Sequence, residues 1–153
     1  MAQAQTASQI TLQMRRTFAA PRERVFRAWT DASELASWFA PSPDFAIVIP
    51  ELDLRVGGKC EVEMHHKSGT VHRLHSVYRE VKPPEKIAFT WQWEAEAAAP
   101  ETLVTVEFFE LQKGDSGGST EVVLTHERFT SEEEKQKHNH GWAGCLDQLA
   151  HFL

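Results

Sequence analysis

Residues 131–153 read SEEEKQKHNHGWAGCLDQLAHFL, and this last stretch of the chain decides the fold. Ser131 is of a type that caps helix N-termini, and the three glutamates after it favour the positive end of a helix dipole. From His138 onward, a set of mostly apolar residues recurs every three or four positions, which is the spacing of one helix face. The stripe consists of His138, Trp142, Cys145, Leu149 and Phe152, and Leu146 broadens it. We therefore predict a long terminal helix with one buried face.

Two glycines interrupt this helix, Gly141 and Gly144. Glycine lowers helix propensity by about 1 kcal/mol relative to alanine, so its presence asks for a reason. Close approach of another backbone segment and room for a ligand would each explain it.

Most of the chain before this helix alternates apolar and polar residues, the period-2 pattern of half-buried strands. The expected strands span residues 10–18, 45–54, 59–66, 71–79, 87–93, 102–111 and 120–129. Glycine- or proline-containing turns join the last six, so consecutive strands should form antiparallel hairpins. Between the first two strands we expect two short helices, the first beginning near Pro21 and the second capped by Ser33.

The expected fold class is α+β with a helix-grip architecture. About seven strands form a twisted antiparallel sheet, two short helices follow the first strand, and the long C-terminal helix packs on the concave face, because a sheet with one dry face needs a cover. We expect residues 1–9 to be a disordered tail and residues 10–153 to be a single domain. The tail lacks the cationic start and apolar stretch of an export signal.

Composition limits the classes of partner. The chain has 153 residues and a net charge of −6, which disfavours nucleic acids and anionic membrane surfaces as partners. No segment approaches the ~18 consecutive apolar residues of a membrane span. Cys60 and Cys145 lack the spacing of a zinc site or a disulfide framework, so both are expected to be reduced core residues. A cytoplasmic location follows as the expectation.

Strand parity and the helix stripe identify the side chains that face the interior. They are aromatic and methionine-rich, which suits an apolar ligand, although a solid core would show the same residue types. The candidate apolar walls are Trp38, Met64, Leu74, Trp91, Trp93, Phe108, Trp142 and Leu149.

Three polar residues on the interior side are candidate ligand anchors: Arg16, Tyr78 and His126. A buried polar group costs several kcal/mol unless it is paired, so each needs a partner or a ligand. Arg16 would either form an internal ion pair with Asp53 or Glu51, or grip a ligand carboxylate. His126 would be either a hydrogen-bonded core histidine or an acid–base group.

Metal, cofactor and nucleophile motifs are not apparent. The adjacent His65 and His66 point to opposite faces of a strand, and His138 and His140 diverge on the helix. Ser76 lacks the surroundings of a nucleophile elbow. We expect no metal, no cofactor and no catalytic residue.

Short motifs in order along the chain resemble the START-like (SRPBCC) superfamily, and within it the domain of the activator of heat-shock protein 90 ATPase. The matching stretches are RTF at 16–18, AP at 20–21, VFRAWT at 25–30, WF at 38–39, DLRVGG at 53–58, YREV at 78–81, PPE at 83–85, FTW at 89–91, LTHE at 124–127 and GW at 141–142, with Leu146, Asp147 and Leu149. The resemblance covers nearly the whole chain.

This resemblance implies the helix-grip fold and a cavity between sheet and C-terminal helix, where relatives bind lipids, sterols, hormones or polyketides. The leading expectation is a non-enzymatic domain that binds a small apolar or amphipathic molecule. One alternative is a stress-response role as a co-chaperone that stimulates a heat-shock protein 90 ATPase. The eukaryotic co-chaperone has a separate preceding domain, for which this chain is expected to have no room. A further alternative is a polyketide-cyclase-like enzyme.

Overall fold

The computed structural model of the protein describes residues 10–112 and 118–153. The predicted tail at residues 1–9 lies outside them, as does most of the loop after β6. The elements are β1 (Ile10–Phe18), α1 (Arg22–Thr30), α2 (Ala32–Trp38), β2 (Phe45–Leu52), β3 (Lys59–His66), β4 (Val71–Lys82), β5 (Lys86–Trp93), the 3₁₀ turn η2 (Glu94–Glu96), β6 (Thr102–Gln112), β7 (Ser119–Phe129) and α3 (Glu132–Phe152).

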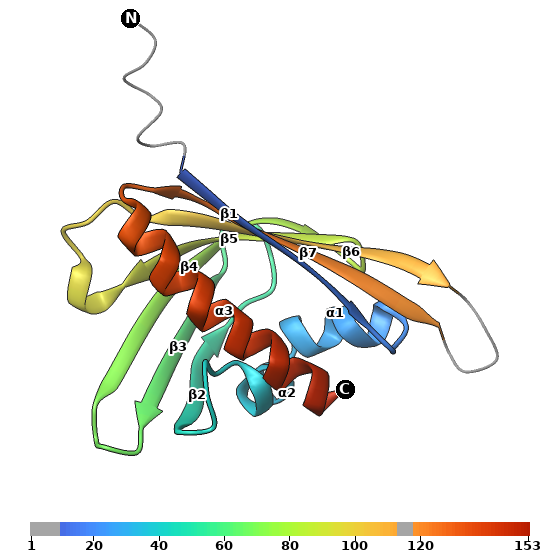
Figure 1. Ribbon diagram of the computed structural model, residues 1–153, viewed down its shortest axis with the longest axis horizontal. Helices are drawn as coiled ribbons and strands as arrows, with labels where there is room; N and C mark the ends of the chain where they lie inside the picture. The colour runs from blue at the N-terminus through green and yellow to red at the C-terminus, as the bar shows by residue number, and fades with distance from the viewer. Residues whose placement is uncertain (1–9, 113–117) are drawn as a thin grey trace, which may run out of the picture.

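Within the described residues the strands form one antiparallel sheet in the order β1-β7-β6-β5-β4-β3-β2. The chain leaves the sheet after β1, forms α1 and α2, and re-enters at the opposite edge as β2. From there each strand pairs with the next until β7 closes on β1. The sheet curves around α3, which lies along its concave face, while α1 and α2 lie at the end where the chain finishes (Figure 1). The predicted α+β helix-grip architecture is confirmed.

The two short helices form as the sequence predicts, with one correction. Val25, Phe26 and Trp29 are the large apolar residues that α1 buries. The cap of α2 is Asp31, whose carboxylate accepts a hydrogen bond from the backbone N–H of Glu34 at 3.1 Å. The predicted cap, Ser33, instead donates its hydroxyl to Asp31 Oδ2 at 2.7 Å. An ionised carboxylate is the stronger acceptor, so the helix starts at Ala32, two residues earlier than a cap at Ser33 would start it.

The long helix α3 begins at the predicted cap, because Ser131 Oγ accepts from the N–H of Glu134 at 3.1 Å. Polar contacts outside the core tie its second half to other elements. Arg16 Nη1 on β1 donates to Asp147 Oδ1 at 2.8 Å, and the Arg24 guanidinium of α1 lies 5.0 Å from the centre of the Phe152 ring. These contacts fix the C-terminal half of the helix against both β1 and α1.

The two helix glycines differ in what surrounds them. A Cβ atom on Gly144 would lie 2.0 Å from the carbonyl oxygen of Pro41, a distance that no methyl group tolerates. A Cβ atom on Gly141 would meet nothing within 4 Å. Gly144 therefore allows α3 to contact the backbone after α2, whereas Gly141 borders open space.

We predict opposite effects from alanine at these two positions. Gly144→Ala forces α3 away from Pro41 and should lower the free energy of unfolding by about 1–3 kcal/mol, as overpacking does. Gly141→Ala should raise it by up to about 1 kcal/mol through helix propensity. Urea unfolding followed by circular dichroism measures both. Equal effects of the two substitutions would contradict the close approach at Pro41.

Candidate ligand-binding site

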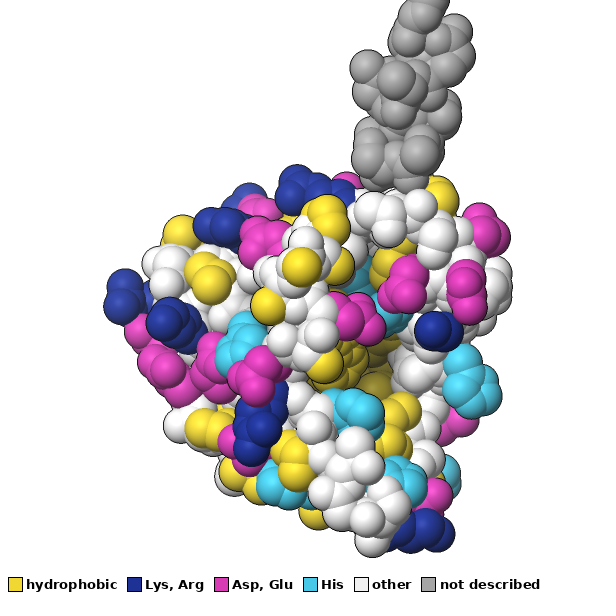
Figure 2. All heavy atoms as spheres, turned by 90° about the vertical axis from the view of Figure 1, so that its left-hand side faces the viewer, with side chains coloured by type: hydrophobic (Ala, Val, Ile, Leu, Met, Phe, Trp, Pro, Cys, Tyr) yellow, Lys and Arg dark blue, Asp and Glu magenta, His cyan; other side chains and the backbone are white. Residues whose placement is uncertain are grey.

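The molecule is hollowed on the face formed by the start of α3, η2 and the β3–β4 hairpin. Figure 2 shows this hollow with hydrophobic side chains at its floor and histidine and carboxylate side chains around its rim. It consists of two neighbouring depressions, which share Trp91, Trp93 and His138.

The first depression, called here the apolar hollow, lies between β3, β5 and α3 and has a volume of about 140 Å³. Its lining residues are Pro41, Met64, Trp91, Trp93, Lys137, His138, Gly141, Trp142 and Cys145. Met64, Trp91, Trp142 and Cys145 are themselves buried, so they form a floor held by the core. Gly141 lines this hollow, and a Cβ atom added to it would meet nothing within 4 Å.

The second depression, called here the charged hollow, has a volume of about 240 Å³. It lies between the end of β5, η2 and the loop after it, the end of β7, and the start of α3. Its lining residues are Trp91, Gln92, Trp93, Glu96, Ala99, Pro100, Thr102, Arg128, Phe129, Thr130, Glu134 and His138. Arg128 adopts the left-handed backbone region, with φ of 78°, which non-glycine residues rarely occupy.

A hydrogen bond between Trp93 and His138 joins β5 to α3 where the two hollows meet. Trp93 Nε1 donates to His138 Nε2 at 3.2 Å, and His138 Nδ1 contacts the carbonyl oxygen of Glu134 at 2.8 Å. An indole N–H only donates, so Nε2 accepts and the imidazole proton sits on Nδ1. His138 is therefore neutral in this arrangement.

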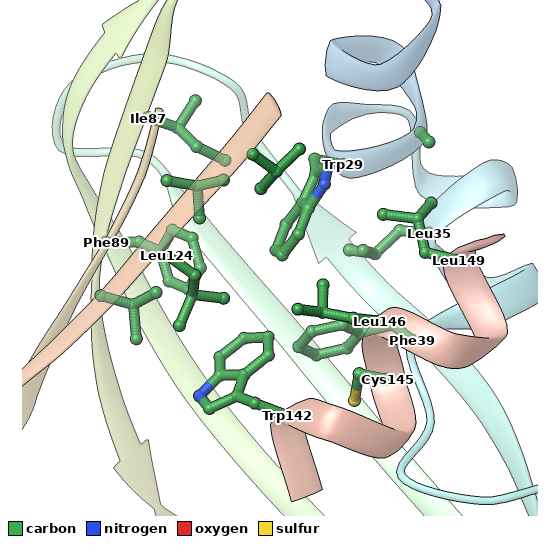
Figure 3. Packing of buried hydrophobic residues seen from close by; sticks show 14 of the residues in the cluster. Trp29, Leu35, Phe39, Ile87, Phe89, Leu124, Trp142, Cys145, Leu146 and Leu149 are labelled. Atoms are coloured by element: carbon green, nitrogen blue, oxygen red, sulfur yellow. The ribbon is translucent and has the colours of Figure 1, made fainter. Parts of the chain in front are cut away.

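The centre of the interior, by contrast, is filled. Figure 3 shows Trp29 and Phe39 projecting between the sheet residues Phe89 and Leu124 and the helix residue Leu146. Only about 20 Å³ remains at the cavity among Trp29, Leu35, Phe39, Cys60, Val62, Leu74, Ser76, Tyr78 and Phe89. That volume holds about one water molecule. Space for a ligand thus lies toward the N-terminal half of α3, away from the middle of the sheet.

The predicted wall residues divide between these places. Met64, Trp91, Trp93 and Trp142 meet at the apolar hollow. The others are core residues: Leu74 borders the small central cavity, and Trp38, Phe108 and Leu149 pack within the cluster of buried side chains. Trp38 also donates its indole N–H to the carbonyl oxygen of Ala28 at 2.8 Å, which joins α2 to α1.

Both ring nitrogens of the fully buried His126 are hydrogen-bonded within the core. Trp142 Nε1 donates to its Nδ1 at 3.0 Å, so Nε2 carries the proton and donates to Thr102 Oγ1 at 2.7 Å. Burial, followed by the neighbouring His138, lowers the pKa of His126 from 6.5 to about 2. It is a neutral core histidine, and it offers no nitrogen to a ligand.

The other two predicted anchors are also engaged. Tyr78 is buried beside Cys60, and burial raises the pKa of its hydroxyl. Arg16 pairs with Asp147, so the predicted ion pair with Asp53 or Glu51 is wrong. The reason is topological, since β1 and β2 occupy opposite edges of the sheet and Asp53 pairs locally with Arg55 at 2.8 Å.

Several lining residues were not predicted. Two of them carry a signal in the sequence, because His138 lies on the helix stripe and Gly141 lowers helix propensity. Glu96, Arg128 and Glu134 gave none, since they look like ordinary surface charges until η2 and α3 bring them to one hollow.

The described part of the chain contains no cluster of three or more histidine, cysteine, aspartate or glutamate side chains that could hold a metal ion. Among residues 10–112 and 118–153, no helix has the length and apolar character needed to cross a membrane.

With this geometry established, comparison with known proteins assigns the family. A family model described as "Activator of Hsp90 ATPase homolog 1-like protein" matches residues 19–153. The chain belongs to this family. The resemblance seen in the sequence motifs is thereby confirmed.

Solved structures agree on the fold. A protein from Chromobacterium violaceum is 30% identical with a TM-score of 0.79, and the match covers 92% of this chain and 94% of that one. The AHSA1 protein from Silicibacter pomeroyi is 24% identical with a TM-score of 0.76, covering 92% and 95%. A protein from Arthrobacter aurescens is 22% identical with a TM-score of 0.81, covering 95% and 87%. No curated protein matches the chain significantly.

The core role of His126 predicts how stability depends on pH. Its pKa is about 2 in the folded chain and 6.5 when unperturbed, so acid protonates the unfolded state first. The stabilisation is complete above pH 6.5 and is lost at about 1.4 kcal/mol per pH unit as the pH falls toward 2. Urea unfolding between pH 7.5 and 4.5 measures this slope.

The matched variant is His126→Phe. It leaves the buried N–H of Trp142 without an acceptor, so we expect it to lower the free energy of unfolding at pH 7.5 by about 1–3 kcal/mol. Its stability should fall less steeply with acid than that of the natural chain. If the stability of both proteins fell equally steeply with acid, His126 would not be a buried neutral base.

Proposed function

We propose that the protein binds a small apolar or amphipathic molecule in the apolar hollow and does not act as an enzyme. The observation that supports this most directly is the 140 Å³ hollow walled by Trp91, Trp93 and Trp142 at the open end of the sheet. Ligand sites are concave and mainly apolar, with aromatic side chains common among their walls. The floor is preformed, since the core fixes its side chains.

The size of the hollow limits the ligand. At about 140 Å³ it is smaller than the roughly 300–1,000 Å³ of a typical drug-sized site, so it suits a ring-sized group or one end of a longer molecule. Met64 adds an adaptable wall, because its unbranched thioether adjusts to different shapes.

The chemistry of the lining favours binding over catalysis. Burial raises the pKa of the Cys145 thiol to about 12, which leaves it protonated and a poor nucleophile. His126 uses both nitrogens inside the core. We further propose a cytoplasmic location, supported by Cys60 and Cys145, which are both buried and unpaired.

Blocking the hollow tests the proposal. Gly141→Phe places a ring where nothing lies within 4 Å of the added carbon, so it should fill the hollow with the fold intact. His140→Phe, at an exposed position on the same helix, is the control. The three proteins are compared in a thermal-shift screen of fatty acids, sterols and aromatic polyketides, and by native mass spectrometry after gentle purification. We expect a ligand to bind the natural chain and the control but not Gly141→Phe.

Two results would remove the proposal. One is the absence of any binding across the screen, together with no bound mass after gentle purification. The other is a ligand that binds Gly141→Phe as tightly as the natural chain, because it would have to occupy another place.

A second candidate function rests on the family description, which names an activator of the Hsp90 ATPase. The exposed Phe109 and Leu111 on β6 offer an apolar surface for a protein partner. Mixing the protein with the chaperone of its host should then raise ATP turnover, and Phe109→Ser should reduce the effect. An unchanged rate with no complex would count against this role.

A further inference from the structure

We propose that the ligand is a cationic amphiphile, whose protonated amine binds in the charged hollow while its apolar body occupies the apolar hollow. This inference rests on the proposed function and adds the chemical class of the ligand. It is carried by three features of the charged hollow: aromatic walls, carboxylates that form no ion pair among the described residues, and a neutral histidine at the shared boundary.

The aromatic walls suit an organic cation. Trp91, Trp93 and Phe129 line the charged hollow. The rings of Trp91 and Trp93 meet edge to face, at 90° and with centroids 5.5 Å apart. Trp91 and Phe129 are buried, so a ligand would mainly meet the face of the half-buried Trp93. An ammonium group within about 6 Å of such a face is attracted by the negative potential of the ring.

Two carboxylates provide the charge. Glu96 from η2 and Glu134 from the first turn of α3 both line the hollow. Neither side chain forms an ion pair within the described residues, unlike Glu94 next to them, which contacts His75 at 3.0 Å. Their charge is therefore available to a ligand. A net charge of −6 adds a general attraction for cations.

Two other residues that line the hollow, His138 and Arg128, are of basic types. His138 contributes no charge, because it accepts a hydrogen bond from Trp93. Arg128 is the one guanidinium among the lining residues and is exposed to solvent. It opposes a cation, so removing its charge should strengthen binding.

The boundary between the hollows explains why one ligand would use both. Trp91 and Trp93 form walls of each hollow, so a molecule that packs its body against one side of these rings can place its head group on the other. The apolar hollow has Lys137 at its edge, which disfavours an ammonium group there. The charges at the two hollows therefore favour the ammonium group in the charged hollow and the apolar body in the apolar hollow.

A series of three probes tests the head group. Each probe carries a naphthalene ring on a short alkyl chain, which ends in an ammonium, a hydroxyl or a carboxylate group. We expect isothermal titration calorimetry to show the ammonium probe binding about tenfold more tightly than the alcohol, and the carboxylate probe binding most weakly.

Charge variants locate the effect. Glu134→Gln and Glu96→Gln should each reduce the preference of the ammonium probe over the alcohol several-fold, whereas Arg128→Gln should increase it. Glu132→Gln is the control for a general charge effect, because it removes one charge from the same helix turn. Glu132 does not line the hollow and pairs with Lys135 instead. Binding of the alcohol should change little in all four variants.

The outcomes separate the two proposals. If the alcohol or the carboxylate binds as tightly as the ammonium probe, the cationic head group is wrong and the apolar site stands. If Glu132→Gln weakens ammonium binding as much as Glu134→Gln does, the attraction is a general charge effect and the charged hollow is not the site. If no probe binds, and the wider screen also fails, the proposed function falls as well.

Discussion

Gly144 of α3 lies against the backbone at Pro41, and the rest of the interior depends on that contact. A Cβ atom there would lie 2.0 Å from the Pro41 carbonyl oxygen, so only glycine allows the helix to approach this closely. This approach brings Trp142, Cys145, Leu146 and Leu149 into the core. It also fixes where the helix is close to its neighbours and where, one turn earlier at Gly141, it leaves space.

Two histidines, His126 and His138, form hydrogen bonds with tryptophans between the sheet and α3. His126 is buried, with its proton on Nε2, and it binds the indole of Trp142. His138 is half-buried, with its proton on Nδ1, and it binds the indole of Trp93. In both cases a tryptophan N–H fixes the tautomer, because indole can only donate. The two imidazole rings lie 5.1 Å apart, so the two indole–imidazole pairs are direct neighbours.

Much of the fold follows from the sequence, because strand parity and the helix stripe each require only local periodicity. Those patterns placed Met64, Trp91 and Trp142 on the interior face, where they are. Parity shows which way a side chain points but not how far away the opposite wall is. Trp29 and Phe39 therefore fill a centre that was expected to hold a ligand.

The partner of Arg16 was missed for a related reason. Sequence proximity suggested acidic residues near β2, while closure of β7 on β1 places Arg16 beside α3. The charged hollow was invisible because it assembles from η2, β7 and α3, which are distant in sequence.

The floor of the apolar hollow consists of side chains that also stabilise the core, and this joint use limits how the site can diverge among related proteins. A substitution at Met64, Trp91 or Trp142 alters the cavity and the stability of the fold together. Pro41, Lys137 and Gly141 border the hollow outside the set of core residues. Divergence in ligand choice should accumulate first at such border positions, where a new side chain reshapes the entrance without disturbing the folded scaffold.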